Sequence, residues 1–185
     1  MRLFFGVPVN EDVRSRVEAL QARLRRCGEK VKWVEPENLH FTLRFVGEVP
    51  DRDTEVVARA GEGLAEGSMP VGVRLQGVGA FPSPRRARVV WVKLTQGGDS
   101  LARISRGLDA RLEAALALPP EPRGFTPHLT IGRVKVPMSG SALGQAIEEL
   151  REEDLGGFTA EAFVLYHSTL TPQGPVYRVL RRYGV

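Results

Sequence analysis

Two short stretches of this 185-residue chain carry the same residue types in the same order. His-Phe-Thr-Leu occupies residues 40–43, and His-Leu-Thr-Ile occupies residues 128–131, an offset of 88 residues (128 − 40). This offset is close to half the chain, as a duplicated lobe would give. Because side chains alternate between the two faces of a strand, each stretch presents an imidazole and a hydroxyl on one face and two apolar anchors on the other.

His40, Thr42, His128 and Thr130 together suit displacement at a phosphate ester. Imidazole has an unperturbed pKa of about 6.5, so one ring can take a proton from water while the other gives a proton to the leaving oxygen. Threonine hydroxyls can donate hydrogen bonds to the non-bridging oxygens without adding charge. We therefore predict that these four residues are catalytic. The residues alone leave open which imidazole is the acid.

The remaining histidine does not fit this pattern. His167 also has a threonine two places on, but Ser168 between them offers no apolar anchor and the position breaks the 88-residue offset. The chain holds three histidines and one cysteine, with no H-x-H, H-E-x-x-H or C-x-x-C motif. We therefore expect neither a metal site nor a cofactor.

The hydrophobic pattern predicts the elements that carry these motifs. Strands often follow one another in adjacent pairs, which favours an α+β fold with largely antiparallel sheets over a doubly wound parallel sheet. Strands are expected at 3–7, 31–34, 39–46, 71–75, 89–94, 128–134, 158–166 and 176–180, and helices at about 11–26, 51–66, 99–116 and 141–150.

Length and composition restrict the class of protein. A mass of 20.4 kDa corresponds to one domain or two small lobes that share a core. The single cysteine, Cys27, excludes an internal disulfide, and no apolar run reaches the ~20 residues of a membrane span. We expect a cytoplasmic monomer. The net charge of +4 favours an anionic partner, although a compositional bias toward arginine gives the same balance.

Longer stretches around the motifs resemble a known family. Residues 33–47, residues 125–134 and the tail at 165–177 are similar to the two-histidine phosphoesterases. The most similar branch is that of the RNA 2′,3′-cyclic phosphodiesterases, also called 2′-5′ RNA ligases. The resemblance implies that residues 1–185 form one bilobal, pseudo-twofold domain. It has two largely antiparallel sheets flanked by helices, a central cleft and one His-x-Thr motif per lobe.

The resemblance also implies an activity and roles for the four residues. The expected reaction is metal-free opening of an RNA 2′,3′-cyclic phosphate end to a 2′-phosphate, with reversible 2′-5′ ligation by the same groups. His40 would protonate the departing 3′ oxygen and His128 would take a proton from water, while Thr42 and Thr130 hold the phosphoryl oxygens. The alternatives are a non-catalytic RNA-binding module, or the same chemistry on a small cyclic nucleotide.

Three further residues receive an interpretation. This branch often has a basic residue directly before the phenylalanine of the second motif; here Gly124 stands there and Arg123 lies one place earlier. We predict that Arg123 contacts phosphate and that Phe125 stacks on a base or ribose, the alternatives being a solvated arginine and a packed aromatic at the strand entry. Arg133 has the wrong parity to share a face with His128, which favours a structural role.

Overall fold

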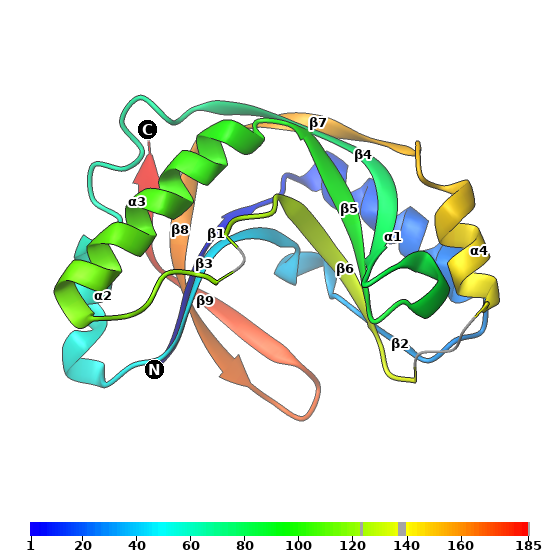
Figure 1. Cartoon of the computed structure of the whole chain (residues 1–185), viewed down its shortest axis with the longest axis horizontal. Helices are drawn as coiled ribbons and strands as arrows, with labels where there is room; N and C mark the ends of the chain where they lie inside the picture. Colours follow the sequence, from blue (N-terminus) through cyan, green and yellow to red (C-terminus); the bar gives the residue numbers. More distant parts are fainter. Residues whose placement is uncertain (123, 137–139, 185) are drawn as a thin grey trace.

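The computed structural model describes residues 1–122, 124–136 and 140–184. Within them the chain forms nine strands and four α-helices (Figure 1). The strands are β1 (Arg2–Pro8), β2 (Val31–Trp33), β3 (His40–Glu48), β4 (Val71–Phe81), β5 (Val89–Gln96), β6 (His128–Val134), β7 (Asp154–Ala160), β8 (Ala162–Leu170) and β9 (Pro175–Gly184). The helices are α1 (Glu11–Arg25), α2 (Thr54–Arg59), α3 (Gly98–Leu116) and α4 (Ala142–Glu149).

All nine strands belong to one strongly curled sheet, in the order β7-β4-β5-β6-β3-β1-β8-β9, with β2 paired to β6. Every recorded strand pair is antiparallel, as expected. The prediction of two sheets is wrong, because the two motif strands pair with each other. Phe41 of β3 lies opposite Leu129 of β6, and this short ladder joins the two halves into one sheet.

The strand order is symmetric about the β3–β6 pair. Moving outward, one half reads β3-β1-β8-β9 and the other reads β6-β5-β4-β7. In the chain, α1 lies between β1 and β3, just as α3 lies between β5 and β6. Figure 1 shows α2 and α3 at one end of the molecule and α1 and α4 at the other. Each motif strand is therefore preceded by a strand–helix unit of the same kind.

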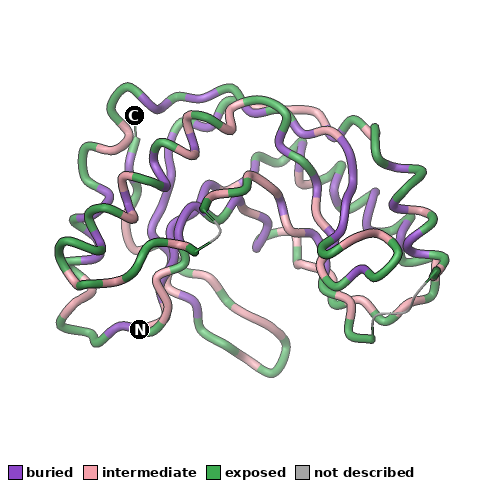
Figure 2. Tube along the Cα trace, in the orientation of Figure 1, coloured by how far each residue is buried: buried purple, intermediate pink, exposed green. Residues whose placement is uncertain are grey.

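The helices cover one face of the sheet. The apolar stripe of α1 is buried from Val13 to Leu24, and Asn10 begins the helix by accepting a hydrogen bond from the Val13 amide at 3.0 Å. Phe41 and Leu129 are fully buried in the same core. Figure 2 shows that both the strands and the helices contain buried segments. The opposite face of β3 and β6 is consequently left for other contacts.

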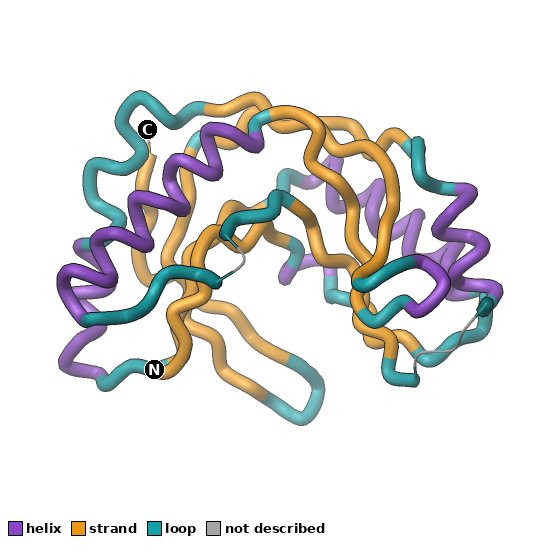
Figure 3. Tube along the Cα trace, in the orientation of Figure 1, coloured by secondary structure: helices purple, strands orange, loops and turns teal. Residues whose placement is uncertain are grey.

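Several predicted elements differ from the structure, whose helices and strands are shown in Figure 3. β4 extends to Phe81 and β9 to Gly184, beyond the expected ends at residues 75 and 180. The single strand expected at 158–166 is two strands, β7 and β8, which break at Glu161 and lie near opposite ends of the sheet order. The helix expected at 51–66 ends at Arg59. Gly63 has a φ of 71°, a left-handed conformation that a helix cannot include, and the chain continues in turns. Within the described residues, no helix combines the length and apolar character needed to cross a membrane.

Candidate active site

The two motifs lie side by side on the exposed face of the central strands. Phe41 and Leu129 point into the core, so the residues on either side of each point the other way. An antiparallel register through this pair places His40 beside Thr130, and Thr42 beside His128. The two histidines are then diagonal neighbours, a relation that separates residues on adjacent strands by about 7–8 Å.

Both imidazoles are held in the same way. Nδ1 of His40 lies 2.7 Å from the carbonyl oxygen of Asn38, and Nδ1 of His128 lies 2.6 Å from that of Thr126, in each case two residues earlier. A carbonyl oxygen can only accept, so Nδ1 carries the hydrogen and Nε2 is left for proton transfer. In His40 this Nε2 lies 3.0 Å from the Thr42 hydroxyl.

Aromatic rings enclose the His40 side of the site. The ring of His40 lies 4.8 Å from that of Phe4 and 5.4 Å from that of Tyr177, measured between centroids. Burial lowers the pKa of His40 to about 4, against the opposing effect of the Asn38 carbonyl. With no charged group beside its ring, His40 is therefore neutral at neutral pH.

A bulge follows the threonine in each motif. The register between β1 and β3 skips Leu43, and the register between β5 and β6 skips Ile131, again 88 residues apart (131 − 43). Buried side chains of the helices satisfy both bulged carbonyls. The Ser105 hydroxyl of α3 donates to the Leu43 oxygen at 2.7 Å, and the Gln21 amide of α1 donates to the Ile131 oxygen at 3.0 Å.

The bulges change which residues face the site. After the skipped residue, Phe45 and Arg133 lie on the same face as the histidines, and both line the cleft. The parity argument that placed Arg133 on the other face is therefore wrong, because simple alternation does not account for the bulge at Ile131. Phe45 was missed for the same reason. The guanidinium of Arg2 lies 5.1 Å from the centre of the Phe45 ring.

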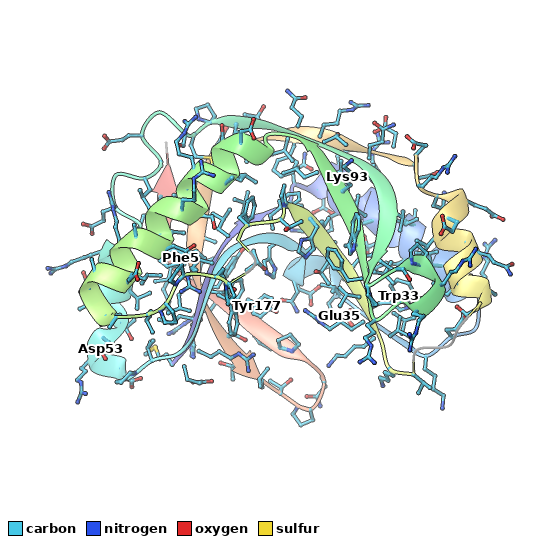
Figure 4. All side chains as sticks on the ribbon, viewed as in Figure 1. Phe5, Trp33, Glu35, Asp53, Lys93 and Tyr177 are labelled. Carbon is cyan, nitrogen blue, oxygen red and sulfur yellow. The ribbon has the colours of Figure 1, made fainter. Side chains whose placement is uncertain are left out.

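An open cleft of about 420 Å³ extends from His40 toward the β8–β9 hairpin and β2. Its walls bring together aromatic, cationic and polar side chains, several of which are labelled in Figure 4. His40, Thr42 and Thr130 are among its lining residues, whereas His128 is not. The ionisable lining residues comprise one imidazole, one phenol, three cations and one carboxylate: His40, Tyr177, Arg2, Lys32, Arg133 and Glu35. This balance favours an anionic ligand.

The remaining predicted residues lie elsewhere. Arg123 falls outside the described residues. Phe125 is half-buried, packs against the main core and is not among the residues that line the cleft, so its stacking role stays a prediction. His167 lies on β8 between Tyr166 and Ser168, which face the cleft side, and so it points toward the core face. In the described part of the chain, no three His, Cys, Asp or Glu side chains are clustered as a metal site would require.

Comparison with known proteins gives the family of this chain. The sequence matches the LigT-like phosphoesterase family twice, over residues 7–91 and 92–177, with one motif in each match. The RNA 2′,3′-cyclic phosphodiesterase of Methanothermobacter thermautotrophicus is 36% identical over 177 residues, covering 96% of this chain and 95% of that protein. The protein of the same name from Archaeoglobus fulgidus is 37% identical over 182 residues, covering 98% of each.

Solved structures agree with this comparison. A crystal structure of a Thermus thermophilus protein has a TM-score of 0.83 at 32% identity, covering 100% of this chain and 97% of that chain. Escherichia coli LigT, solved in complex with 3′-AMP, has a TM-score of 0.75 at 23% identity and the same coverage, a likeness that concerns the fold. The resemblance seen in the motifs is confirmed: the chain belongs to the LigT-like phosphoesterase family.

Proposed function

We propose that this protein hydrolyses the 2′,3′-cyclic phosphate at RNA ends to a 2′-phosphate, with His40 and His128 as the proton-transfer groups. The observation that carries the proposal is the matched pair of imidazoles, each held through Nδ1 to a carbonyl oxygen on one face of paired strands. The names of the full-length relatives support the substrate. The proposal takes residues 1–185 as one bilobal domain with one motif per lobe.

The position of the cleft supports the roles of the two histidines. The cleft lies on the His40 side of the motifs, so a nucleotide bound there has its ribose beside His40. The bond that breaks joins phosphorus to the ribose 3′ oxygen, and His40 gives that oxygen a proton. Water attacks from the opposite side, where His128 removes a proton from it. One proton is taken up and one released, so the step needs no other reactant.

The acid role requires His40 to be protonated when the substrate is bound. Burial alone keeps the pKa of His40 at about 4. A bound phosphodiester brings a negative charge next to the ring, and an adjacent opposite charge raises the pKa of an imidazole. We infer that the substrate itself supplies the charge that makes His40 an acid.

Other side chains of the cleft have separate tasks in this proposal. Thr42 and Thr130 donate hydrogen bonds to the non-bridging oxygens as charge develops on them. Arg133 pairs with a phosphate oxygen, and Phe45 offers an exposed ring on which a base can stack. Phe45 and Arg133 occupy corresponding positions after the two motifs, yet one side chain is aromatic and the other is cationic. This difference allows the cleft to bind an asymmetric substrate.

Hydrolysis of an RNA oligonucleotide with a 2′,3′-cyclic phosphate end, measured in excess EDTA, tests the proposal. We expect turnover to a 2′-phosphate, and we expect His40→Ala and His128→Ala each to lose nearly all of it while keeping the circular dichroism of the parent. RNA binding without any turnover in the parent protein would instead favour a binding module. Turnover confined to mononucleotides in a substrate panel would favour a small cyclic nucleotide.

A further inference from the structure

A buried arginine lies directly after the bulge of the first motif and takes no part in the proposed chemistry. Arg44 follows the skipped residue Leu43 on β3, and its side chain is 7% exposed. Its Nε lies 2.6 Å from Oδ1 of Asp109 on α3, and its Nη1 lies 3.1 Å from Oε1 of Glu121. A buried cation is costly unless it is paired, so these contacts restrict the guanidinium to one place.

The guanidinium also binds backbone carbonyls. Nη1 donates to the Phe45 oxygen at 3.0 Å, and Nη2 donates to the Pro119 oxygen. Pro119 and Glu121 belong to the segment between α3 and β6, which leads to His128 (Figure 1). Arg44 therefore connects the strand of the first motif to the segment that precedes the second motif.

The corresponding segment of the first half is held by its backbone. β2, which leads to His40, lies 88 residues before residues 119–121 (119 − 31) and pairs with β6 in a regular ladder. Gly132 of β6 allows this close approach, because a Cβ there would lie 2.8 Å from the Val31 side chain. Hydrogen bonds between strands therefore fix the residues that precede the first motif.

In the second half, side chains take over this task. Residues 119–120 are both proline and have no amide hydrogen, so neither can donate to a neighbouring strand. Arg44 is the counterpart of Gly132 (132 − 44 = 88), and its guanidinium contacts the segment that strand pairing would otherwise hold. Asp109 is likewise the counterpart of Gln21 (109 − 21 = 88), whose amide connects α1 to the segment before the first motif at 2.9 Å.

Short contacts continue from Glu121 to the second motif. The Gly124 amide donates to the Glu121 carbonyl at 3.0 Å, which closes a turn. Two residues after this turn, the Thr126 carbonyl oxygen lies 2.6 Å from Nδ1 of His128. The guanidinium and the imidazole are thus linked by one ion pair, one turn and one hydrogen bond.

We propose that Arg44 is a positioning residue for His128: by holding the segment between α3 and β6, it keeps the Thr126 carbonyl where that carbonyl orients the imidazole. Arginine suits this task because its planar fork binds carboxylates and carbonyls at the same time, a geometry that a lysine ammonium does not reproduce. The inference rests on the proposed function for its effect on turnover. The orientation of the ring is measurable without turnover.

The first measurement follows the imidazole nitrogens by NMR in the protein without substrate. A carbonyl beside Nδ1 favours the tautomer with the hydrogen on that nitrogen, so the nitrogen chemical shifts report whether the carbonyl is in place. We expect Arg44→Met to move the His128 ring signals toward a mixture of tautomers. The His40 ring signals should stay in place, because β3 remains paired with β1. Arg44→Lys keeps the charge without the fork and should give the same change at His128.

Two variants of Glu121 test the same contact without removing a buried charge. Loss of Arg44 leaves the Asp109 carboxylate without its cation and can prevent folding, whereas the Glu121 side chain is 38% exposed. We expect Glu121→Ala to move the His128 ring signals in the same direction as Arg44→Met. Glu121→Gln should keep the parent signals, because its amide oxygen still accepts from the guanidinium.

Hydrolysis of the cyclic phosphate then separates kcat from KM. We expect Arg44→Met to lower kcat about 10- to 100-fold and Glu121→Ala to lower it less. KM should stay close to the parent value, because neither residue lines the cleft. Two controls should keep the parent kcat and ring signals. Arg74→Met removes an exposed arginine that lies 2.6 Å from Asp154, and Leu143→Ala weakens the core at α4.

The failures of the two proposals are distinguishable. Parent ring signals in Glu121→Ala, or in a folded Arg44→Met, would overturn the positioning role. Equal movement of the His40 and His128 signals would do the same, because it would show a general loss of packing. Absence of hydrolysis in the parent protein, with His128 signals that still move in Glu121→Ala, would overturn the proposed function and leave the contact standing.

Discussion

The replacement Gly6→Ala tests whether the position of His40 limits activity. Gly6 lies on β1 next to Thr42 of β3, and the strands approach closely there. A Cβ at residue 6 would lie 2.9 Å from the carbonyl oxygen of Phe41 and 3.1 Å from Cδ2 of His40. Ordinary contact begins at 3.4 Å, so the carbonyl must recede by 0.5 Å (3.4 − 2.9) and the imidazole by 0.3 Å (3.4 − 3.1).

These shifts matter because catalytic groups must be held to within about 0.5 Å of their productive geometry. The Phe41 carbonyl belongs to the backbone of the motif, so it cannot move without moving His40 and Thr42. We expect a loss of about 10- to 100-fold in kcat, the effect of a displacement of this order. Overpacking of this kind costs about 1–3 kcal/mol of unfolding free energy.

The assay compares Gly6→Ala with Gly72→Ala, a matched change in β4. A Cβ at residue 72 meets only the flexible end of the Gln96 side chain, at 3.4 Å. We expect Gly72→Ala to keep the parent kcat. In NMR spectra, Gly6→Ala should move the ring signals of His40 and leave those of His128 in place. If Gly6→Ala hydrolyses the cyclic phosphate within twofold of Gly72→Ala, the steric argument is wrong.

The same contacts support three further predictions. Ser105→Ala and Gln21→Leu should each lower the unfolding free energy in urea by about 1–3 kcal/mol, because a buried carbonyl loses its donor; unchanged midpoints would contradict this. The folded-state pKa of His40 lies below its ordinary value of 6.5, at about 4, so the unfolded chain binds more protons between these limits. The unfolding free energy should therefore fall as the pH is lowered from 6.5 toward 4, and it should fall less in His40→Gln than in the parent protein. NMR titration should show that a bound 2′-nucleotide raises the pKa of His40. Thr42→Ala and Thr130→Ala should each lower kcat by about 10- to 1000-fold with little change in stability. A variant that keeps the parent kcat would show that its threonine has no part in the mechanism.

The sequence predicted the parts of the fold that local pattern determines. The span of β6 was predicted to the residue, and the spans of α1, α3 and α4 nearly so, because apolar stripes, the Asn10 cap and flanking turns mark them. The alternation within each motif correctly separated anchors from site residues, since Phe41 and Leu129 are fully buried. These features depend on neighbours within a few residues, which a single sequence displays directly.

Features set by contacts between distant segments were not predictable in this way. Whether β3 pairs with β6 depends on a ladder centred on Phe41 and Leu129, and two unjoined sheets have the same local sequence. Nothing in the residues around Ile131 indicates the bulge. The Ile131 carbonyl accepts a hydrogen bond from the side-chain amide of Gln21, which lies 110 residues away in the sequence. Alternation alone therefore assigned Arg133 to the wrong face.

The two halves of the site share a frame and differ in their surroundings, and the proposed displacement reaction depends on this difference. Identical tethers on Asn38 and Thr126 fix both imidazoles with Nε2 available. If the surroundings were also identical, both rings would have the same proton affinity, and neither would be preferred as donor or acceptor. Tight aromatic packing around His40 lowers its pKa, and in the proposed mechanism the charge of the bound phosphate raises it again. In the proposed mechanism, the asymmetric cleft makes proton donation depend on substrate, while the symmetric strands hold the two rings side by side.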